Sequence, residues 1–118
     1  MLAVSQHIYE QLTDFDTANG VFNGDIYPVI APQEAAYPIC VYRLRELGAY
    51  SKAGINTYEV DVIVLHTDAR AILTISDQLK AHFESDPAFN FLNGEVTVNN
   101  DKPDEAILIQ TYNIKQII

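Results

Sequence analysis

The chain has 118 residues, of which 48% are hydrophobic and 19% are charged. This balance indicates a globular protein rather than a disordered one, and the length fits a single domain over residues 1–118. Sixteen acidic residues against seven basic ones give a formal net charge of −9. The chain therefore lacks the positive surface with which nucleic-acid-binding proteins grip phosphates.

Apolar runs and cysteine content exclude further classes. No apolar run approaches the roughly 18 residues of a membrane span, and the first residues lack the pattern of a signal peptide, so we expect no membrane partner. Cys40 is the only cysteine, which excludes an intrachain disulfide and a zinc site built from several cysteines. We expect it to be a small buried side chain.

The stretch 57–83 predicts a strand that leads directly into a helix. Residues 57–66 alternate, with one apolar face over the even positions from Tyr58 to Val64, as a half-buried strand does. Asp68 follows as a helix N-cap. The helix of about 16 residues then carries one apolar stripe at helical spacing. Its members are Ile72, Ile75, Leu79 and Phe83.

The rest of the chain predicts one more helix and three more strands. Residues 2–15 show a helical stripe, and three prolines within residues 28–38 predict an extended arm instead of a helix or strand. Residues 39–46, 95–99 and 105–117 alternate as strands, and Asn93-Gly94 predicts a turn before the second of these. The element order predicts an α+β domain with a mainly antiparallel four-stranded sheet, two helices packed on one face and an extended Pro-rich arm.

The two strands at 39–46 and 57–66 predict an antiparallel hairpin with a defined register. Pairing Arg43 with Asp61 and Arg45 with Glu59 matches opposite charges on the polar face. The same register brings apolar residues together on the core face, and agreement between both faces favours it.

Candidate catalytic and metal-binding residues form no recognisable pattern. His66, Asp68, His82 and Glu84 are potential ligands without the spacing of a known metal motif, so we interpret them as structural or solvated. The sequence has no nucleophile motif and no phosphate-binding glycine loop. We therefore expect no enzyme activity, no catalytic residue, no metal and no cofactor.

The Pro-rich arm carries a resemblance to a known family. The segments Ile26–Pro28, Ala31–Gln33 and Tyr37–Tyr42 resemble the pattern of small tail-completion, or tail terminator, proteins of long-tailed bacteriophages and prophages. The family pattern continues with a strand similar to Tyr58–Val62 and a helix similar to Ile72–Phe83. The likeness spans nearly the whole chain, and the arm is its most specific part.

The resemblance implies a structural virion protein that forms a ring, typically a hexamer. Such a ring sits at the head-proximal end of the tail, in the virion neck, after assembly in the bacterial host cytoplasm. It ends polymerisation of the tail-tube protein and joins the tail to the head-tail connector protein, while DNA passes through without specific binding. The departures from the pattern are Cys40, where an aliphatic residue is usual, and the hydrophobic C-terminus.

An interface with another copy or with the tube is expected around the loop between the hairpin strands and at the C-terminus. The residues are Leu47, Tyr50, Lys52, Ile55, Ile117 and Ile118. Two alternatives stay open: a head-side connector adaptor, and a small cytosolic α+β binding domain or enzyme with a cleft near His66.

Overall fold

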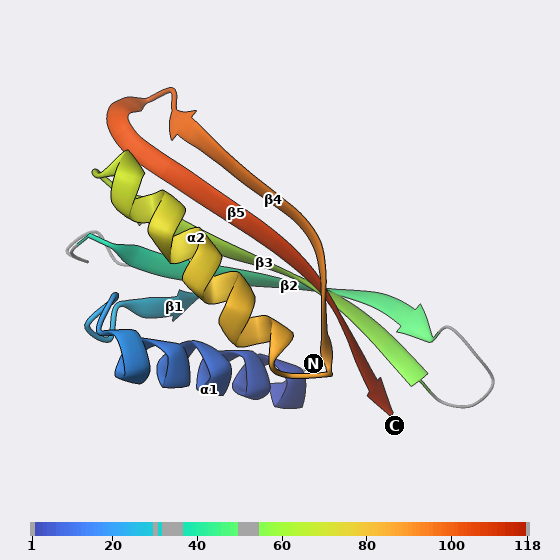
Figure 1. The fold of residues 1–118 in the computed structure, drawn as a ribbon. Coiled ribbons are helices and arrows are strands. Elements are labelled where there is room, and N and C mark those ends of the chain that lie inside the picture. The colour runs from blue at the N-terminus through green and yellow to red at the C-terminus, as the bar shows by residue number, and fades with distance from the viewer. Residues whose placement is uncertain (1, 30, 32–36, 50–54, 118) are drawn as a thin grey trace.

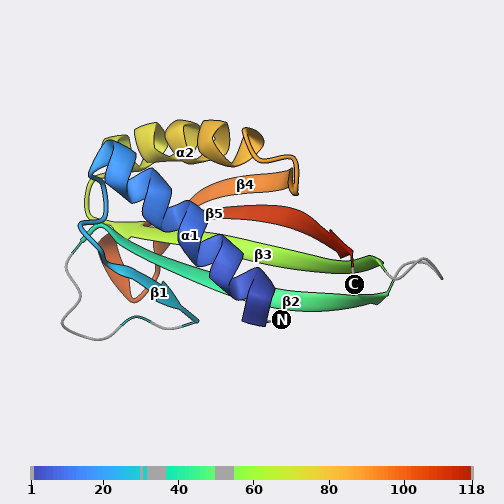
Figure 2. The same ribbon diagram turned by 90° about the horizontal axis from the view of Figure 1, so that it is seen from below.

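The computed structural model describes residues 2–29, 31, 37–49 and 55–117. Its elements in chain order are α1 (Leu2–Asn19), β1 (Ile26–Pro28), β2 (Ile39–Ala49), β3 (Ile55–His66), α2 (Ala69–Glu84), β4 (Phe89–Asn99) and β5 (Lys102–Ile117). The strands form one sheet in the order β1-β2-β3-β5-β4. Figure 1 shows the twisted sheet, and Figure 2 shows both helices over the same face. The α+β class is confirmed.

Each helix is held to the sheet by one apolar stripe. The buried residues are Val4, Ile8, Leu12 and Phe15 in α1 and Ile72, Ile75, Leu79 and Phe83 in α2. Burying one such side chain contributes about 1.5–3 kcal/mol, so these two stripes account for much of the driving force. Among the described residues, neither helix is long and apolar enough to cross a membrane.

The helix ends are set by short polar side chains and a glycine. Asp68 is the N-cap of α2, as predicted, and its carboxylate accepts hydrogen bonds from the backbone N–H groups of Arg70 and Ala71. Helix α1 ends at Asn19, and the next residue, Gly20, has a φ of 62° that suits a residue without a Cβ. Asp16 in the last turn of α1 then accepts three backbone N–H groups of residues 22–24, which shapes the loop that leads into β1.

The helix-facing side of β2, β3 and β5 is built from even-numbered residues, and it includes one buried amide. Gln110, only 1% exposed, donates from Nε2 to the backbone oxygen of Ser76 at 2.9 Å and accepts from the Tyr112 hydroxyl at 2.7 Å. These bonds attach β5 to the middle of α2. Because a buried amide without partners is unfavourable, they also fix how α2 lies across the sheet.

The register predicted for the β2–β3 hairpin is the one observed. Arg43 pairs with Asp61 and Arg45 with Glu59, and the pattern continues in both directions along the two strands. A register shift between Glu46 and the end of β2 interrupts the ladder near the hairpin loop. The charge and apolar patterns on opposite faces therefore specified the same pairing.

The predicted strand number was wrong because the arm contributes a fifth strand. Residues Ile26–Pro28 form β1, which pairs in parallel with Cys40–Tyr42 of β2, and the sheet is therefore mixed. The prolines led us to exclude pairing here, but Pro28 lies on an edge strand, where a missing N–H costs little. Ile30 and residues 32–36 of the arm lie outside the described residues.

The predicted turn at Asn93-Gly94 was also wrong. Both residues lie inside β4, which runs unbroken from Phe89 to Asn99, with a register shift against β5 between Phe91 and Asn93. Leu92 is the extra residue of a bulge at this point, and Asn93 and Gly94 both pair with β5 directly after it. The long partner strand β5 pairs with β4 on both sides of this shift, so the strand pair continues through it.

Candidate assembly surface

Three strands project beyond the helices at one end of the sheet. Figure 2 shows β2, β3 and β5 continuing past the N-terminal end of α1, so that this end of the sheet has no helix over it. We call it the β-projection and define it as residues 46–49 of β2, 55–57 of β3 and 115–117 of β5. Leu47 on the β-projection is 45% exposed.

The β-projection brings together the predicted interface residues that the structure describes. Ile55 and Ile117 are direct backbone partners across β3 and β5, and Leu47 lies in β2 beside the same end of β3. These positions are far apart in the sequence, so their shared location depends on β5 being next to β3. The predicted residues Tyr50, Lys52 and Ile118 lie outside the described residues.

The sheet face opposite the helices carries an ionic cluster centred on Asp61. The Asp61 side chain is only 7% exposed and accepts from Arg43 Nη2 at 3.2 Å, Arg45 Nη1 at 3.0 Å and Thr111 Oγ1 at 2.9 Å. Arg45 also binds Glu59, and the hydrogen bonds to Glu59 and Asp61 raise the pKa of Arg45. Both guanidinium groups are about half exposed, so the cluster presents positive charge to solvent above a buried carboxylate.

At the other end of the same sheet face, Tyr37 and Glu105 form a tyrosine–carboxylate contact. The Tyr37 hydroxyl donates to Glu105, which is 5% exposed and also accepts from the Asn99 side chain at 2.8 Å. Burial acts to raise the pKa of Glu105, but these two hydrogen bonds and the Lys102 charge together lower it. The hydrogen bond to Glu105 in turn raises the pKa of Tyr37. This contact attaches the segment before β2 to the start of β5.

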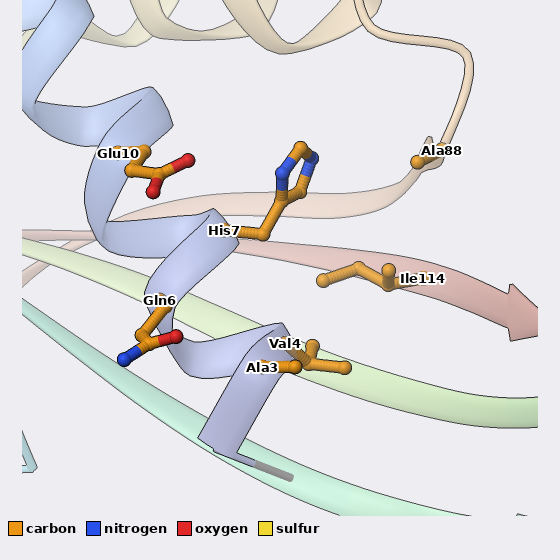
Figure 3. Close-up of a pocket in the computed structure, with 7 residues that line it drawn as sticks. All are labelled: Ala3, Val4, Gln6, His7, Glu10, Ala88 and Ile114. Carbon is orange, nitrogen blue, oxygen red and sulfur yellow. The ribbon is translucent and has the colours of Figure 1, made fainter.

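A hollow of about 370 Å³ lies between α1 and the segment before β4. Figure 3 shows His7 and Glu10 on α1 beside it, with Ala88 and Ile114 on the other side. His7 Nε2 lies 2.9 Å from Asp86 Oδ2, and its ring stacks on Phe89 with centroids 5.5 Å apart. The histidine therefore has structural partners, and its contacts hold α1 against the turn after α2.

A second histidine extends this contact. Gln11 donates to Asp86 at 3.0 Å, and its carbonyl oxygen lies 3.0 Å from His82 Nε2. The network joining α1, α2 and the following turn was missed by the sequence analysis. The only signal for it is that His7 and Gln11 lie four residues apart on one helix face.

The remaining candidates for chemistry are separated and have structural roles. His66 Nδ1 accepts from the backbone N–H of Thr67, Asp68 caps α2, and His82 contacts Gln11. Within the described ranges, no group of three or more His, Cys, Asp or Glu residues has an arrangement that could hold a metal ion. Cys40 is fully buried, and burial raises the pKa of its thiol, so it is an unreactive thiol at neutral pH.

Comparison with known proteins adds no family assignment. The chain matches no protein-family model, and no curated protein matches it.

Proposed function

We propose that this protein is a ring-forming tail terminator, a structural virion protein at the head-proximal end of a phage tail. In this proposal about six copies form the ring, end tube polymerisation and join the tail to the head-tail connector in the virion neck. The observation that carries the proposal is the β-projection. A ring that meets a coaxial tube needs a part that extends from the body of each subunit, and here three strands extend past the helices with Leu47 exposed.

Two further observations support the proposal. The arm, with Tyr37 attached to Glu105 and β1 attached to β2, is the part of the sequence that resembles the tail-terminator family. The net charge of −9 suits a ring around a channel through which DNA passes, because like charge prevents adhesion. The head-side connector adaptor would share both features, and the two differ in whether the chain binds the tail tube.

The direct test is a tube-capping assay. Tail-tube protein from the same phage genome polymerises with and without the full chain, and tube lengths are measured by negative-stain electron microscopy. We expect shorter tubes with a ring of extra density at one end. Unchanged tube lengths without terminal density would contradict the terminator proposal, and binding to the connector alone would favour the adaptor.

A matched pair of variants tests the role of the β-projection. Leu47 and Tyr9 are each 45% exposed, but Tyr9 lies on the outer surface of α1. Leu47→Asp should abolish capping while Tyr9→Asp retains it, with both variants unfolding at the wild-type urea midpoint. If the two variants cap tubes equally well, the β-projection does not contact the tube and this part of the proposal is wrong.

A further inference from the structure

Exposed apolar side chains gather along two opposite edges of the sheet. Apart from Tyr9 and Tyr37, each large hydrophobic side chain found exposed among the described residues lies near the β1–β2 edge or near the β4 edge. They are Leu2, Val29 and Leu47 at the first edge and Leu73, Leu92, Val96 and Val98 at the second. Figure 1 shows that β1 and β4 bound the sheet on opposite sides. Single exposed hydrophobic residues are ordinary, but two groups on two strand edges are typical of interfaces.

The β2-edge surface is defined by Leu2 and Val29 of the first group together with the partly buried Leu44. These residues line an open hollow of about 240 Å³ on the helix side of the sheet. Beside it β2 has a free edge, because β1 pairs only with Cys40–Tyr42 and, within the described part of the chain, no strand pairs with residues 43–49 on that side. Backbone N–H and C=O groups there remain available to another strand.

Val29 has an unusual backbone conformation for its residue type. Its φ is 67°, in the left-handed region that glycine or asparagine adopts far more readily than a β-branched residue, and its side chain is 70% exposed. Burial within this chain therefore does not offset the strain. A contact with another molecule supplies a physical reason for an apolar side chain at this position.

The β4-edge surface is defined by three members of the second group, Leu73, Val96 and Val98. Val96 and Val98 point to the helix side of β4, opposite Leu108 and Ala106 of β5, yet they are 42% and 55% exposed. A groove of about 390 Å³ lies between α2 and β4 and is lined by Val96, so α2 does not cover this valine. Leu73 lies on the groove side of α2, one turn before Asp77, and is 55% exposed.

We propose that the two surfaces bind each other in neighbouring copies of this chain, with β4 of one copy added to the free edge of β2 in the next. Each adjacent strand pair from β2 through β3 and β5 to β4 is antiparallel, so β4 runs opposite to β2. When both copies keep their helices on the same side, the new strand pair is antiparallel as well. The sheet then continues from copy to copy through backbone hydrogen bonds.

One register satisfies both faces of the new strand pair. Placing Leu44 beside Val96 of the next copy joins apolar side chains on the helix side. The same register places Arg45 beside Glu95, which joins opposite charges on the other face, where the Arg45 side chain is 51% exposed. Complementarity on both faces is the property that set the β2–β3 register within the chain.

The proposed contact is heterologous, because the two surfaces differ in residues and shape. Heterologous contacts produce closed rings or open filaments, so this inference supplies the subunit interface that the proposed tail-terminator ring requires and rests on that function for its biological role. The contact itself is a property of the isolated chain. It can be tested without a tube.

The decisive experiment is light scattering of the full chain and two edge variants over a wide concentration range. We expect the wild type to rise above its chain mass of 13.2 kDa, and expect both Leu2→Asp/Val29→Asp and Val96→Asp/Val98→Asp to remain at 13.2 kDa. Tyr9→Asp is the control and should behave as wild type. A wild-type chain that stays monomeric at its highest soluble concentration overturns the proposal, as do edge variants that assemble normally.

Mixing the two edge variants tests the head-to-tail arrangement. Each variant retains one intact surface, so the mixture should form a dimer of twice the chain mass and grow no further, with slower hydrogen exchange at amides of residues 94–97. Absence of this dimer contradicts the heterologous contact. If the edge variants still cap tail tubes, capping does not need the contact between β2 and β4. If the wild type assembles but does not cap tubes, the tail-terminator function is refuted and the contact between copies is not.

Val29→Asn separates folding from association. Asparagine accepts a positive φ, so the variant should have a melting temperature equal to or above that of the wild type, measured where both are monomeric. It also removes apolar surface from the β2-edge surface, and we expect weaker association. Association at wild-type strength would contradict the proposal.

Discussion

Removing the Asp61 carboxylate tests whether the ionic cluster stabilises the fold. Asp61 is nearly buried and accepts hydrogen bonds from Arg43, Arg45 and Thr111. A hydrogen bond to a charged group contributes about 1.5–3 kcal/mol when it is buried, whereas an exposed ion pair contributes about 0.2–1 kcal/mol. Because both guanidinium groups are half exposed, we assign the lower values to the arginine contacts and the higher range to Thr111.

Asp61→Ala should therefore lower the free energy of unfolding by about 2–5 kcal/mol, out of the about 5–15 kcal/mol that a domain usually has. Urea unfolding followed by far-ultraviolet circular dichroism measures this loss, and the midpoint should fall by about 2 M for a chain of this size. The chain contains no tryptophan, so circular dichroism is a better probe than tryptophan fluorescence.

Two controls make the test of Asp61 specific. Asp61→Asn retains an oxygen that can accept from Thr111, so its loss should be about half that of the alanine variant. Glu59→Gln alters the more exposed partner of Arg45 and should cost at most about 1 kcal/mol. If Asp61→Ala costs no more than Glu59→Gln, the reasoning from burial and hydrogen-bond number is refuted.

Three further changes test other contacts. Gln110→Ala should lower the free energy of unfolding by about 2–4 kcal/mol, because it leaves a cavity and an unpaired Tyr112 hydroxyl; a urea-measured loss below about 1 kcal/mol contradicts this. The Tyr37–Glu105 contact should weaken in two pH ranges measured by thermal melting. The pKa of Tyr37 is raised, so its contribution to stability is complete below the ordinary value of 10.0 and disappears as the pH rises through the raised pKa. The pKa of Glu105 is lowered, so its contribution to stability is present above 4.5 and disappears as the pH falls through the lowered pKa. Tyr37→Phe should abolish the alkaline step of this contact, and a step of wild-type size in that variant would assign it to another group. Asp16→Ala removes the acceptor for three backbone N–H groups and should cost about 1–3 kcal/mol by urea unfolding; an unchanged midpoint would show that this loop contributes little.

Local periodicity was sufficient to predict the helices and the hairpin. The four buried positions of α2 and its Asp68 cap follow from residue types within one short segment. The β2–β3 register also depends on nearby sequence, because Arg43 and Asp61 lie on adjacent strands and match on both faces. In these elements each local preference agrees with the tertiary structure.

The strand order could not be predicted, because it depends on contacts between distant residues. The pairing of β1 with β2 needs the loop that Asp16 organises and the hydrogen bond from the backbone N–H of Cys40 to Asp25. Asn93-Gly94 has turn propensity, but pairing with the long strand β5 keeps both residues inside β4, and the bulge lies directly before them. Gln110 lies in a strand that is apolar on both faces, so only the position of α2 shows that its amide is buried.

The residues of the candidate surfaces also fall into those that local sequence could predict and those that depend on contacts between distant strands. Leu47 and Ile55 were predicted because they belong to the segment between the hairpin strands, and Ile117 was predicted because the C-terminus is hydrophobic. The edge surfaces were missed, because nothing in the sequence near Val96 shows that β4 is an edge strand. A valine pattern on a short strand predicts a covered face, and the structure instead leaves that face beside a groove.

The two halves of β4 differ in how their free edge is protected against pairing with other chains. Edge strands in soluble proteins are commonly protected by bulges, prolines or lysines, because an unprotected edge pairs with other chains. The first half of β4 contains the bulge near Phe91, but the stretch from Glu95 to Val98 pairs regularly with β5 and contains neither proline nor lysine. A regular edge of this length next to Val96 and Val98 favours unwanted aggregation unless a specific partner covers it. Glu95 on the opposite face limits that partner to a strand with positive charge at the matching position, and the free part of β2 has this charge at Arg45.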